Sequence, residues 1–461
     1  MRLRAHPLRL ALMGTLSLAL VWLVLTKSLP FALAPAAPDL ALALDPGNPV
    51  ALVVKARQIS ERLLAQSSVT QGPAEAQERS APGGGDNTLA RLPEAAGSGG
   101  PGEPLGDREA IRKEIARLAS LAIAKDPLNA EAVRLLAGTA SDPGRVRMLM
   151  EEAAGRSRRE SAALFWLLND SLYRKDYRKA LDYADILLRT QPELSGYVVN
   201  YVAFMAQEPD GLPLVAGVLA KRPSWRGLFF DSLPRSVQQI EVPLKLMTAL
   251  KESGSPPSDK ELAPYLDALI GQDRTDAAYN AWLQFLPPAE LANLNLLTNG
   301  NFESIPSGLP FDWRIARGLN AVAELVPSGS GGAGRLLHVS FGSGRVTFPE
   351  LSQIILLAPG RYRLEGNLRG RIIAKRGLRW QLRCAGGAHR LLAETDALMG
   401  ESQQWRLFSL EADVPESRDC VGQVLRLFHD PRSASEEFIS GEVWFAGLRL
   451  RRATSLTAAT K

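Results

Sequence analysis

Cysteine and histidine are scarce in this chain of 461 residues, which has two cysteines and four histidines. They are Cys384, Cys420, His6, His338, His389 and His429. A structural zinc site needs four such ligands at short, regular spacings, and these residues show no spacing of that kind. We therefore expect neither a metal site nor a cofactor.

Sequence motifs of catalysis are also missing. The chain has no glycine-rich phosphate loop, no nucleophile elbow, no helix-borne histidine pair and no Cys-His constellation. Its neighbouring carboxylates, such as Glu151-Glu152 and Glu436-Glu437, are adjacent in sequence and are therefore interpreted as solvated charge. We expect a protein that is not an enzyme.

Charge of either sign is not in large excess. The 54 basic residues outnumber the 49 acidic ones by 5, and the surplus is spread along the chain. So small a surplus does not predict a nucleic-acid partner. Hydrophobic residues make up 46% of the chain and charged residues 22%, the balance of a protein that folds mostly in water. A chain of this length is expected to form two or three folded units.

Long hydrophobic runs are absent except near the N-terminus. Leu10 to Thr26 is a run of 17 residues without charge, preceded by a basic tail at 1–9 and closed by Lys27. As a helix it would be roughly 25 Å long, slightly short of a hydrocarbon core of ~30 Å, so the expected transmembrane segment is 10–31. The positive-inside rule keeps the tail in the cytoplasm. The sequence thus predicts a single-pass protein of the bacterial inner membrane, with its body in the periplasm or otherwise outside the cytoplasm.

A cleaved signal peptide is the alternative, because Ala32-Leu33-Ala34 has small residues at the spacing of a cleavage site. Both interpretations export the body. The apolar run is longer than that of a usual signal peptide, and Pro35 would follow the cut, which favours an uncleaved anchor. In an oxidising compartment Cys384 and Cys420 are expected to form a disulfide, with two buried free thiols as the alternative.

Helical patterning begins at Pro38, with apolar residues at 3.6-residue periodicity between Pro and Asn-Pro breaks. The break Asp45-Pro46-Gly47-Asn48-Pro49 is echoed by Asp126-Pro127-Leu128-Asn129-Ala130 and, more faintly, near Pro192. Pro127 and Pro192 are 65 residues apart, about twice a unit of ~33 residues, a period typical of stacked helical hairpins. We expect a first repeat at 38–65, a disordered insert rich in Gly, Pro, Ser and Ala at 66–107, and a helical repeat domain at 108–293.

One segment of this region resembles tetratricopeptide repeats. Between Leu164 and Pro192, Trp166 lies on the first expected helix, Tyr177 at the turn and Ala180 on the second helix. The match is incomplete, because Leu168 and Leu187 stand where that family has small residues. The resemblance implies helical hairpins that bind a protein partner, here a partner in the cell envelope. An irregular α-helical bundle is the alternative.

Beyond Leu296 the pattern changes to short alternating segments separated by Gly and Pro. In 361–368, Tyr362, Leu364 and Leu368 share one face, whereas Arg363, Glu365 and Asn367 share the other. Segments 378–384, 424–428 and 442–450 alternate in a similar way. About eight such strands predict an antiparallel two-layer sandwich at 294–452, followed by a flexible tail at 453–461.

The opening Asn299-Gly300-Asn301-Phe302-Glu303 resembles the start of jelly-roll carbohydrate-binding modules, and the closing Gly441-Glu442-Val443-Trp444-Phe445 resembles their last strand. The predicted fold class is therefore multidomain: an N-terminal transmembrane helix, an all-α helical-repeat (tetratricopeptide-like) domain and a C-terminal all-β jelly-roll-like sandwich. Ala446-Gly447 stands where the family commonly has acidic residues, and Glu303 alone is a poor set of calcium ligands, so the family's calcium site is not expected.

The polar face of the alternating strands is the candidate glycan site. If those strands are neighbours, their arginines form one patch whose guanidinium groups could hold the carboxylates of an acidic polysaccharide. A solvated sheet face without a ligand is the alternative. Trp380 is expected in the core, and Trp313, Trp405 and Trp444 are also expected to pack. The candidate residues are Arg363, Glu365, Asn367, Arg379, Gln381, Arg383 and Arg426.

Two functional hypotheses follow. The first is a non-enzymatic scaffold or assembly factor for exopolysaccharide or another envelope glycan, in which the repeats bind a protein partner and the sandwich faces the glycan. The second is a purely structural subunit of an envelope complex that binds no sugar, since a fold does not determine a function. Under the first hypothesis, replacing Arg379 and Arg383 with alanine should abolish binding.

Overall fold

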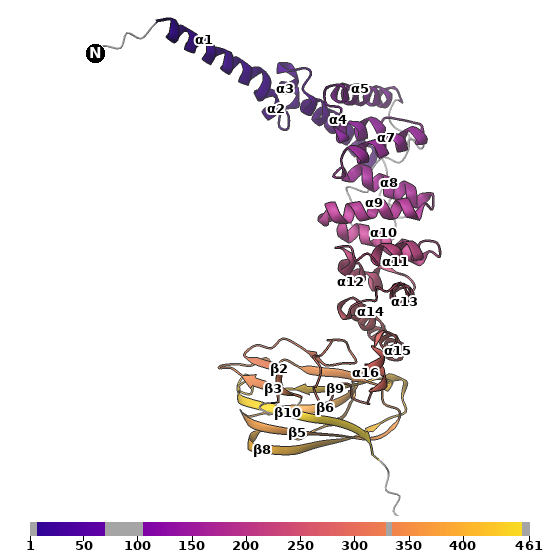
Figure 1. Cartoon of the computed structure of the whole chain (residues 1–461), viewed down its shortest axis with the longest axis vertical. Coiled ribbons are helices and arrows are strands. Elements are labelled where there is room, and N and C mark those ends of the chain that lie inside the picture. Colours follow the sequence, from indigo (N-terminus) through magenta and orange to yellow (C-terminus); the bar gives the residue numbers. More distant parts are fainter. Residues whose placement is uncertain (1–6, 70–104, 329–333, 454–461) are drawn as a thin grey trace, which may run out of the picture. The chain divides into compact units, whose positions relative to one another are not determined.

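The computed structural model describes residues 7–69, 105–328 and 334–453. Helices occupy the first part of the chain and strands the last part, as the sequence predicts (Figure 1). The chain divides into two compact units, residues 1–215 and 216–461. The boundary lies inside α11 (Leu212–Leu219). The second unit contains the helices that follow it and the sandwich.

The first unit begins with a nearly continuous helix. Its segments are α1 (Pro7–Leu23), a π-helical turn (Val24–Ser28) and α2 (Leu29–Leu33). Within it, Met13–Leu33 is, among the described residues, the one helix long and apolar enough to cross a membrane. Its side chains from Met13 to Val24 are exposed. This position agrees with the transmembrane segment predicted at 10–31.

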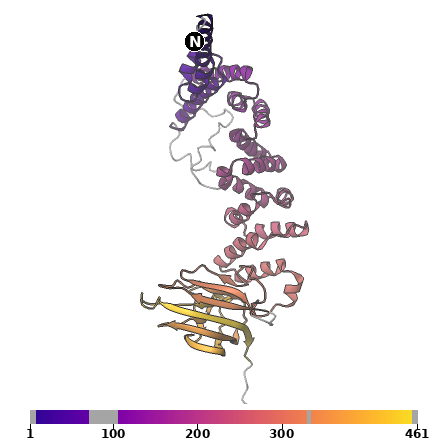
Figure 2. The same ribbon diagram turned by 60° about the vertical axis from the view of Figure 1, so that its left-hand side comes forward.

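Antiparallel helical hairpins follow, stacked one on the next (Figure 2). The helices are α3 (Pro38–Leu44), α4 (Pro49–Val69), α5 (Leu105–Lys125), α6 (Ala130–Ala137), α7 (Pro143–Arg156), α8 (Ser161–Tyr173), α9 (Tyr177–Thr190), α10 (Ser195–Gln207) and α11 (Leu212–Leu219), with a 3-10 turn at Pro192–Leu194. Two hairpins, α6–α7 and α8–α9, lie between Pro127 and Pro192, the number expected from a unit of ~33 residues.

The two Asp-Pro breaks have the same local structure, because each is a loop that caps the next helix. The side-chain oxygens of Asn48 and Asn129 accept hydrogen bonds from the backbone N-H groups of Ala51 and Ala132, respectively, both at 3.0 Å. The two asparagines thereby cap α4 and α6. Helices α4 and α5 extend into both ends of the range predicted as an insert. Residues 70–104, like 1–6 and 454–461, lie outside the described residues.

The helices of the second unit are α12 (Arg226–Ser236), α13 (Val242–Glu252), α14 (Asp259–Gly271), α15 (Thr275–Phe285) and α16 (Pro288–Ala292). Arg226 is buried and makes a bidentate ion pair with Glu261, at 2.7 and 3.0 Å, that joins α12 to α14. Its guanidinium also donates to the Leu219 carbonyl and the Ser255 hydroxyl, both at 2.9 Å. This single side chain therefore joins several segments of the unit.

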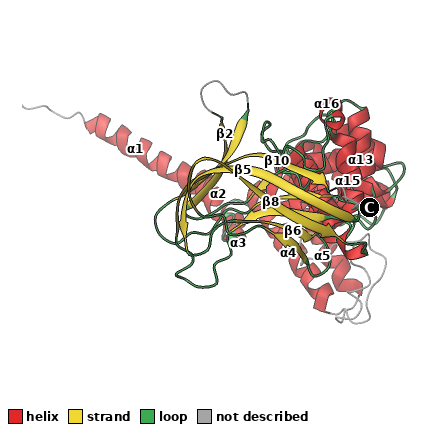
Figure 3. Cartoon of the chain, turned by 90° about the horizontal axis from the view of Figure 1, so that it is seen from below, coloured by secondary structure: helices red, strands yellow, loops and turns green. Residues whose placement is uncertain are grey.

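Two antiparallel sheets form the sandwich (Figure 3). Within the described residues each has five strands, in the orders β1-β4-β9-β6-β7 and β2-β3-β10-β5-β8. The strands are β1 (Arg314–Ile315), β2 (Ala321–Pro327), β3 (Arg335–Phe341), β4 (Leu351–Ile355), β5 (Gly360–Ala374), β6 (Arg379–Cys384), β7 (Leu391–Glu394), β8 (Gly400–Val414), β9 (Gln423–Phe428) and β10 (Ile439–Arg452). The predicted fold class is confirmed.

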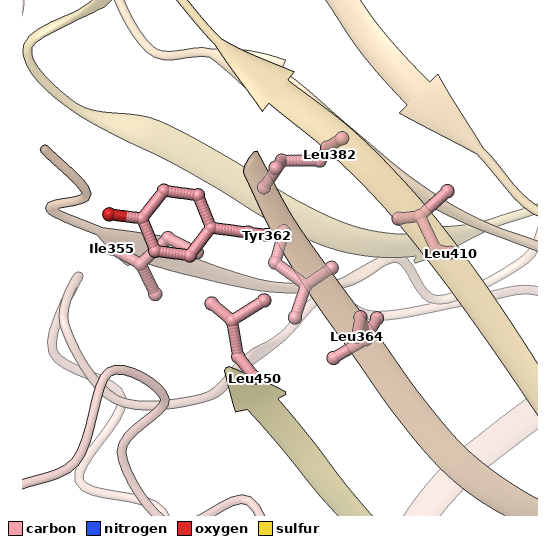
Figure 4. Close-up of a pocket in the computed structure, with 8 residues that line it drawn as sticks. Ile355, Tyr362, Leu364, Leu382, Leu410 and Leu450 are labelled. Carbon is pink, nitrogen blue, oxygen red and sulfur yellow. The ribbon is translucent and has the colours of Figure 1, made fainter. Parts of the chain in front are cut away.

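The core between the sheets is built from the inward-facing residues of the alternating strands. Tyr362, Leu364 and Leu368 of β5 are buried, as predicted, and Trp380 and Trp313 are also in this core. The predicted disulfide between Cys384 and Cys420 is present. A small apolar cavity remains between the sheets, lined by residues such as Ile355, Leu410 and Leu450 (Figure 4). Because core side chains line it, this cavity is a packing defect rather than a ligand pocket.

Candidate functional site

The seven predicted glycan-site residues lie on two different sheets. Arg363, Glu365 and Asn367 are on β5, which pairs with β8 and β10. The other four are on β6 and β9, which pair with each other in the opposite sheet. The prediction of one patch was therefore wrong. The chain crosses from one sheet to the other between β5 and β6, so polar residues that face solvent on these strands point to opposite sides of the sandwich.

On β6 and β9 the polar residues use one another as partners. Arg426 donates to the side-chain oxygen of Gln381 at 2.9 and 3.1 Å and to Glu350 at 2.9 Å. Gln381 in turn donates to Glu394 at 2.7 Å. These four side chains form one hydrogen-bonded row that runs from Glu350, just before β4, through β9 and β6 to Glu394 on β7.

The two remaining arginines of this sheet also have partners in the chain. Arg379 donates to Glu394 at 3.1 Å and to the Thr395 carbonyl at 3.0 Å, and Arg383 donates to the His389 carbonyl at 2.8 Å. A carboxylate ligand would have to replace these acceptors. We interpret this network as structural.

The outer face of β2-β3-β10-β5-β8 is different, because it carries a row of stacked rings. His338, Trp444 and Arg369 are directly opposite one another on β3, β10 and β5. The His338 and Trp444 rings are stacked with centroids 4.8 Å apart. The Arg369 guanidinium lies 5.7 Å from the Trp444 ring centroid and 4.8 Å from that of Trp405 on β8. The guanidinium is thus held between two indoles by cation–π attraction.

This row is accessible. Trp405 is 41% exposed, and Leu407 beside it is also exposed. The prediction that Trp405 packs in the interior was wrong. Strand β8 is at the edge of its sheet, and the β5–β8 pairing shifts register between Leu368 and Gly370, opposite the segment that contains Trp405. An exposed indole can stack on the apolar face of a ligand ring, and a half-buried Trp444 fixes the position of the neighbouring arginine.

Arg369 has no carboxylate within ion-pair distance in the part of the chain that the structure describes. Nearby arginines are paired, since Arg361 contacts Glu411 at 2.6 Å and Arg363 contacts Glu365 at 3.0 Å. Glu324 of β2 and Glu442 of β10 contact the His338 ring instead. Arg369 is therefore a cation that is oriented by rings and remains free to pair with an external anion.

A second basic group lies farther along the same face. Arg451 of β10 is directly opposite Arg363 of β5, and Arg449 is opposite Glu365. Within the described residues neither Arg449 nor Arg451 has an ion-pair partner, and like charges placed directly opposite are unfavourable. Trp444 and Arg451 are seven positions apart on β10, or about 20 Å along a strand. An extended anionic polymer, rather than one sugar, would be needed to contact both groups.

Among the described residues no group of three or more His, Cys, Asp or Glu side chains is arranged to hold a metal ion. The ring of His429 is partly buried, and burial lowers its pKa although it contacts the Arg376 carbonyl at 2.9 Å. This histidine therefore belongs to the packing of the sandwich.

No protein-family model matches the chain, and no curated protein matches it. Solved structures do match its C-terminal part. A putative sugar binding protein from Bacteroides thetaiotaomicron is 11% identical, with a TM-score of 0.25, over 35% of this chain and 100% of that protein. A structure described as CBM4 is 11% identical, with a TM-score of 0.26, over 34% and 99%. TmCBM61, solved with β-1,4-galactotriose, is 18% identical, with a TM-score of 0.22, over 35% and 99%. The sandwich is similar to these proteins.

Proposed function

We propose that this protein is a membrane-anchored, non-enzymatic glycan-binding protein of the bacterial envelope, and that it serves as a scaffold or assembly factor for an acidic polysaccharide. The glycan lies on the outer face of β2-β3-β10-β5-β8, and the helical repeats bind a protein partner. The apolar helix Met13–Leu33 anchors the chain. The disulfide supports a location outside the cytoplasm, because such bonds persist in oxidising compartments.

The observation that carries the proposal is the Trp405-Arg369-Trp444 group. An exposed indole supplies an apolar ring face, and the adjacent guanidinium supplies a charge without a partner in the described chain. A carboxylated sugar offers the complementary pair of features, an apolar ring face and an anion. Charge-assisted hydrogen bonds of this kind contribute about 1.5–3 kcal/mol each.

The test compares Arg369→Gln with wild type in the full chain, in titrations with a soluble polyuronate and with a neutral polysaccharide of similar length. Loss of one charged contact of 1.5–3 kcal/mol should weaken polyuronate binding by about 10- to 150-fold. Wild-type binding should also weaken with salt, because the contact is at the surface. The neutral polysaccharide should bind weakly to both proteins.

Arg383→Gln is the matched control, because it removes an arginine from the opposite sheet that donates to the His389 carbonyl. It should leave polyuronate affinity within about twofold. Trp405→Ala should reduce binding of any polymer that stacks on the indole. If Arg369→Gln binds like wild type, or if Arg383→Gln loses as much affinity, this face is not the site. A wild-type chain that binds no glycan would favour the purely structural subunit.

A further inference from the structure

Helix α3 turns an apolar face outward, the reverse of the usual arrangement for a surface helix. Leu40, Ala43 and Leu44 are at i, i+3 and i+4 and are exposed, with Leu40 at 53% and Leu44 at 47%. The opposite side of the helix is buried through Ala41. A short helix therefore leaves two leucines in contact with whatever surrounds the protein.

This face is held in place by close packing beneath it. Ala34, Ala41 and Ala51, which come from the segment after α2, from α3 and from α4, have no exposed surface and pack together. Small side chains at all three positions allow the three backbones to approach closely. The turn between α2 and α3 is closed by hydrogen bonds from the Ala36 and Ala37 amides to the Leu33 carbonyl, at 3.1 and 2.8 Å. The orientation of α3 is therefore fixed with respect to α2.

The segment formed by α2 and α3 is continuous with the apolar helix. Residues 7–33 are helical throughout, and exposed Phe31 is at the end of this helix, four residues beyond Lys27. Two acids flank the apolar face: Asp39 is paired with Lys55 at 2.7 Å, and Asp45 accepts a hydrogen bond from the Gly47 amide at 3.1 Å. Thus the two exposed leucines lie within 11 residues of the end of the helix at Leu33, on a folded cap formed by α2 and α3.

We propose that Leu40 and Leu44 insert into the surface of the bilayer that holds the apolar helix. The inference rests on the proposed membrane attachment and extends it. An apolar helix face at an interface is buried about 5–10 Å into the boundary between headgroups and acyl chains. The cap would thereby fix the first helical hairpin against the membrane, so that the repeats begin at the lipid surface instead of on a flexible tether.

Fluorescence quenching in the full chain tests this contact. The two native cysteines form the disulfide and no free cysteine is present in the described chain, so Leu40→Cys or Leu44→Cys can be labelled selectively with a nitrobenzoxadiazole dye. The labelled proteins are placed in vesicles of phosphatidylcholine and phosphatidylglycerol that contain lipids spin-labelled either near the headgroup or deep in the acyl chain. Two variants serve as references: Leu20→Cys in the apolar helix, and Met148→Cys, which is 57% exposed on α7.

Dyes at 40 and 44 should lose at least half as much fluorescence as the dye at 20, and a spin label near the headgroup should quench them more than a label deep in the chain. The dye at 148 should be unaffected. If the dye at 20 is quenched and those at 40 and 44 behave like 148, the inference is overturned while membrane attachment stands. If none is quenched, both are overturned. Blue-shifted emission at 40 and 44 without quenching would mean that protein, such as a second copy, covers the face, and would also overturn the inference.

Discussion

The contact between the last helical hairpin and the sandwich makes a quantitative prediction. Phe311, in the loop before β1, is buried, and its ring centroid lies 5.2 Å from that of Tyr279 and 5.4 Å from that of Trp282, both on α15. Beside it, Arg314 donates to both carboxylate oxygens of Asp267 on α14, at 2.8 and 3.1 Å. Helices α14 and α15 are therefore expected to stabilise the sandwich on which they pack.

Replacing Phe311 with alanine removes a buried aromatic ring and leaves a cavity between α15 and the sandwich. Such changes cost about 3–5 kcal/mol. For a unit of this size each kcal/mol lowers the melting temperature by about 2–4 °C, so a fall of roughly 6–20 °C is expected. Phe438→Ala is the matched control, because that ring is 52% exposed just before β10. It should change stability by about 0.5 kcal/mol or less, as surface substitutions usually do.

The assay is unfolding of the full chain. Hydrogen exchange at the β5 and β10 amides monitors it, so that the unfolding of the second unit is distinguished from that of the first. A complementary comparison uses two fragments that begin at residues 216 and 294. The shorter fragment lacks α15 and would expose Phe311 to water, so it should unfold at a lower temperature. If Phe311→Ala costs less than about 1 kcal/mol, or if both fragments unfold together, the helices do not support the sandwich.

Four further predictions concern stability and topology. Arg226→Met should cost about 3–5 kcal/mol in urea unfolding because it leaves the Glu261 carboxylate buried without its cation, whereas replacing both residues with methionine should cost much less. Burial raises the pKa of Glu261, but hydrogen bonds from Arg226 and the Ser258 amide outweigh the effect of burial and hold this pKa below its usual 4.5. The stability that Glu261 contributes is therefore present above about pH 4.5 and is lost as the pH falls through the lower pKa of the folded state. Glu261→Gln should remove this pH dependence, and an unchanged acid profile would contradict the assignment. Serine at both Cys384 and Cys420, which are 36 positions apart, should cost about 3–4 kcal/mol by calorimetry, and a much smaller loss would show that the disulfide is dispensable. A reporter fused after residue 34 should be active only outside the cytoplasm and remain with the membrane fraction, whereas a soluble, shortened product would demonstrate cleavage.

Much of the fold could be predicted because its signals are local. Asp-Pro and Asn-Pro breaks mark where one helix ends and the next begins, and the spacing of Pro127 and Pro192 gave the length of two hairpins. The repeat pattern placed Tyr177 at the turn and Ala180 on the second helix, and both lie in the first turn of α9, where they are buried. Membership of the tetratricopeptide family stays a prediction, because no family model matches the chain.

The site was harder to predict, because it depends on which strands become neighbours. Alternation along β5 shows correctly that Arg363 faces solvent, but it contains no information about the sheet to which the strand belongs. Arg369 and Trp444 are 75 positions apart in sequence and meet only because β10 inserts between β3 and β5. Trp405 was misplaced for a related reason, since edge position and register shift are properties of strand pairing.

Arginine also has opposite roles on the two sheets, and only its acceptors distinguish them. Arg379 and Arg383 each donate to acceptors on or beside β7, so replacing both with alanine would leave Glu394 without one of its donors and weaken the edge of that sheet. A loss of glycan binding in that double variant could thus come from local unfolding, and unchanged binding would leave the opposite face untested. Replacing Arg369 removes a charge that is held by ring stacking alone within the described chain, so its effect on affinity reports directly on an external anion.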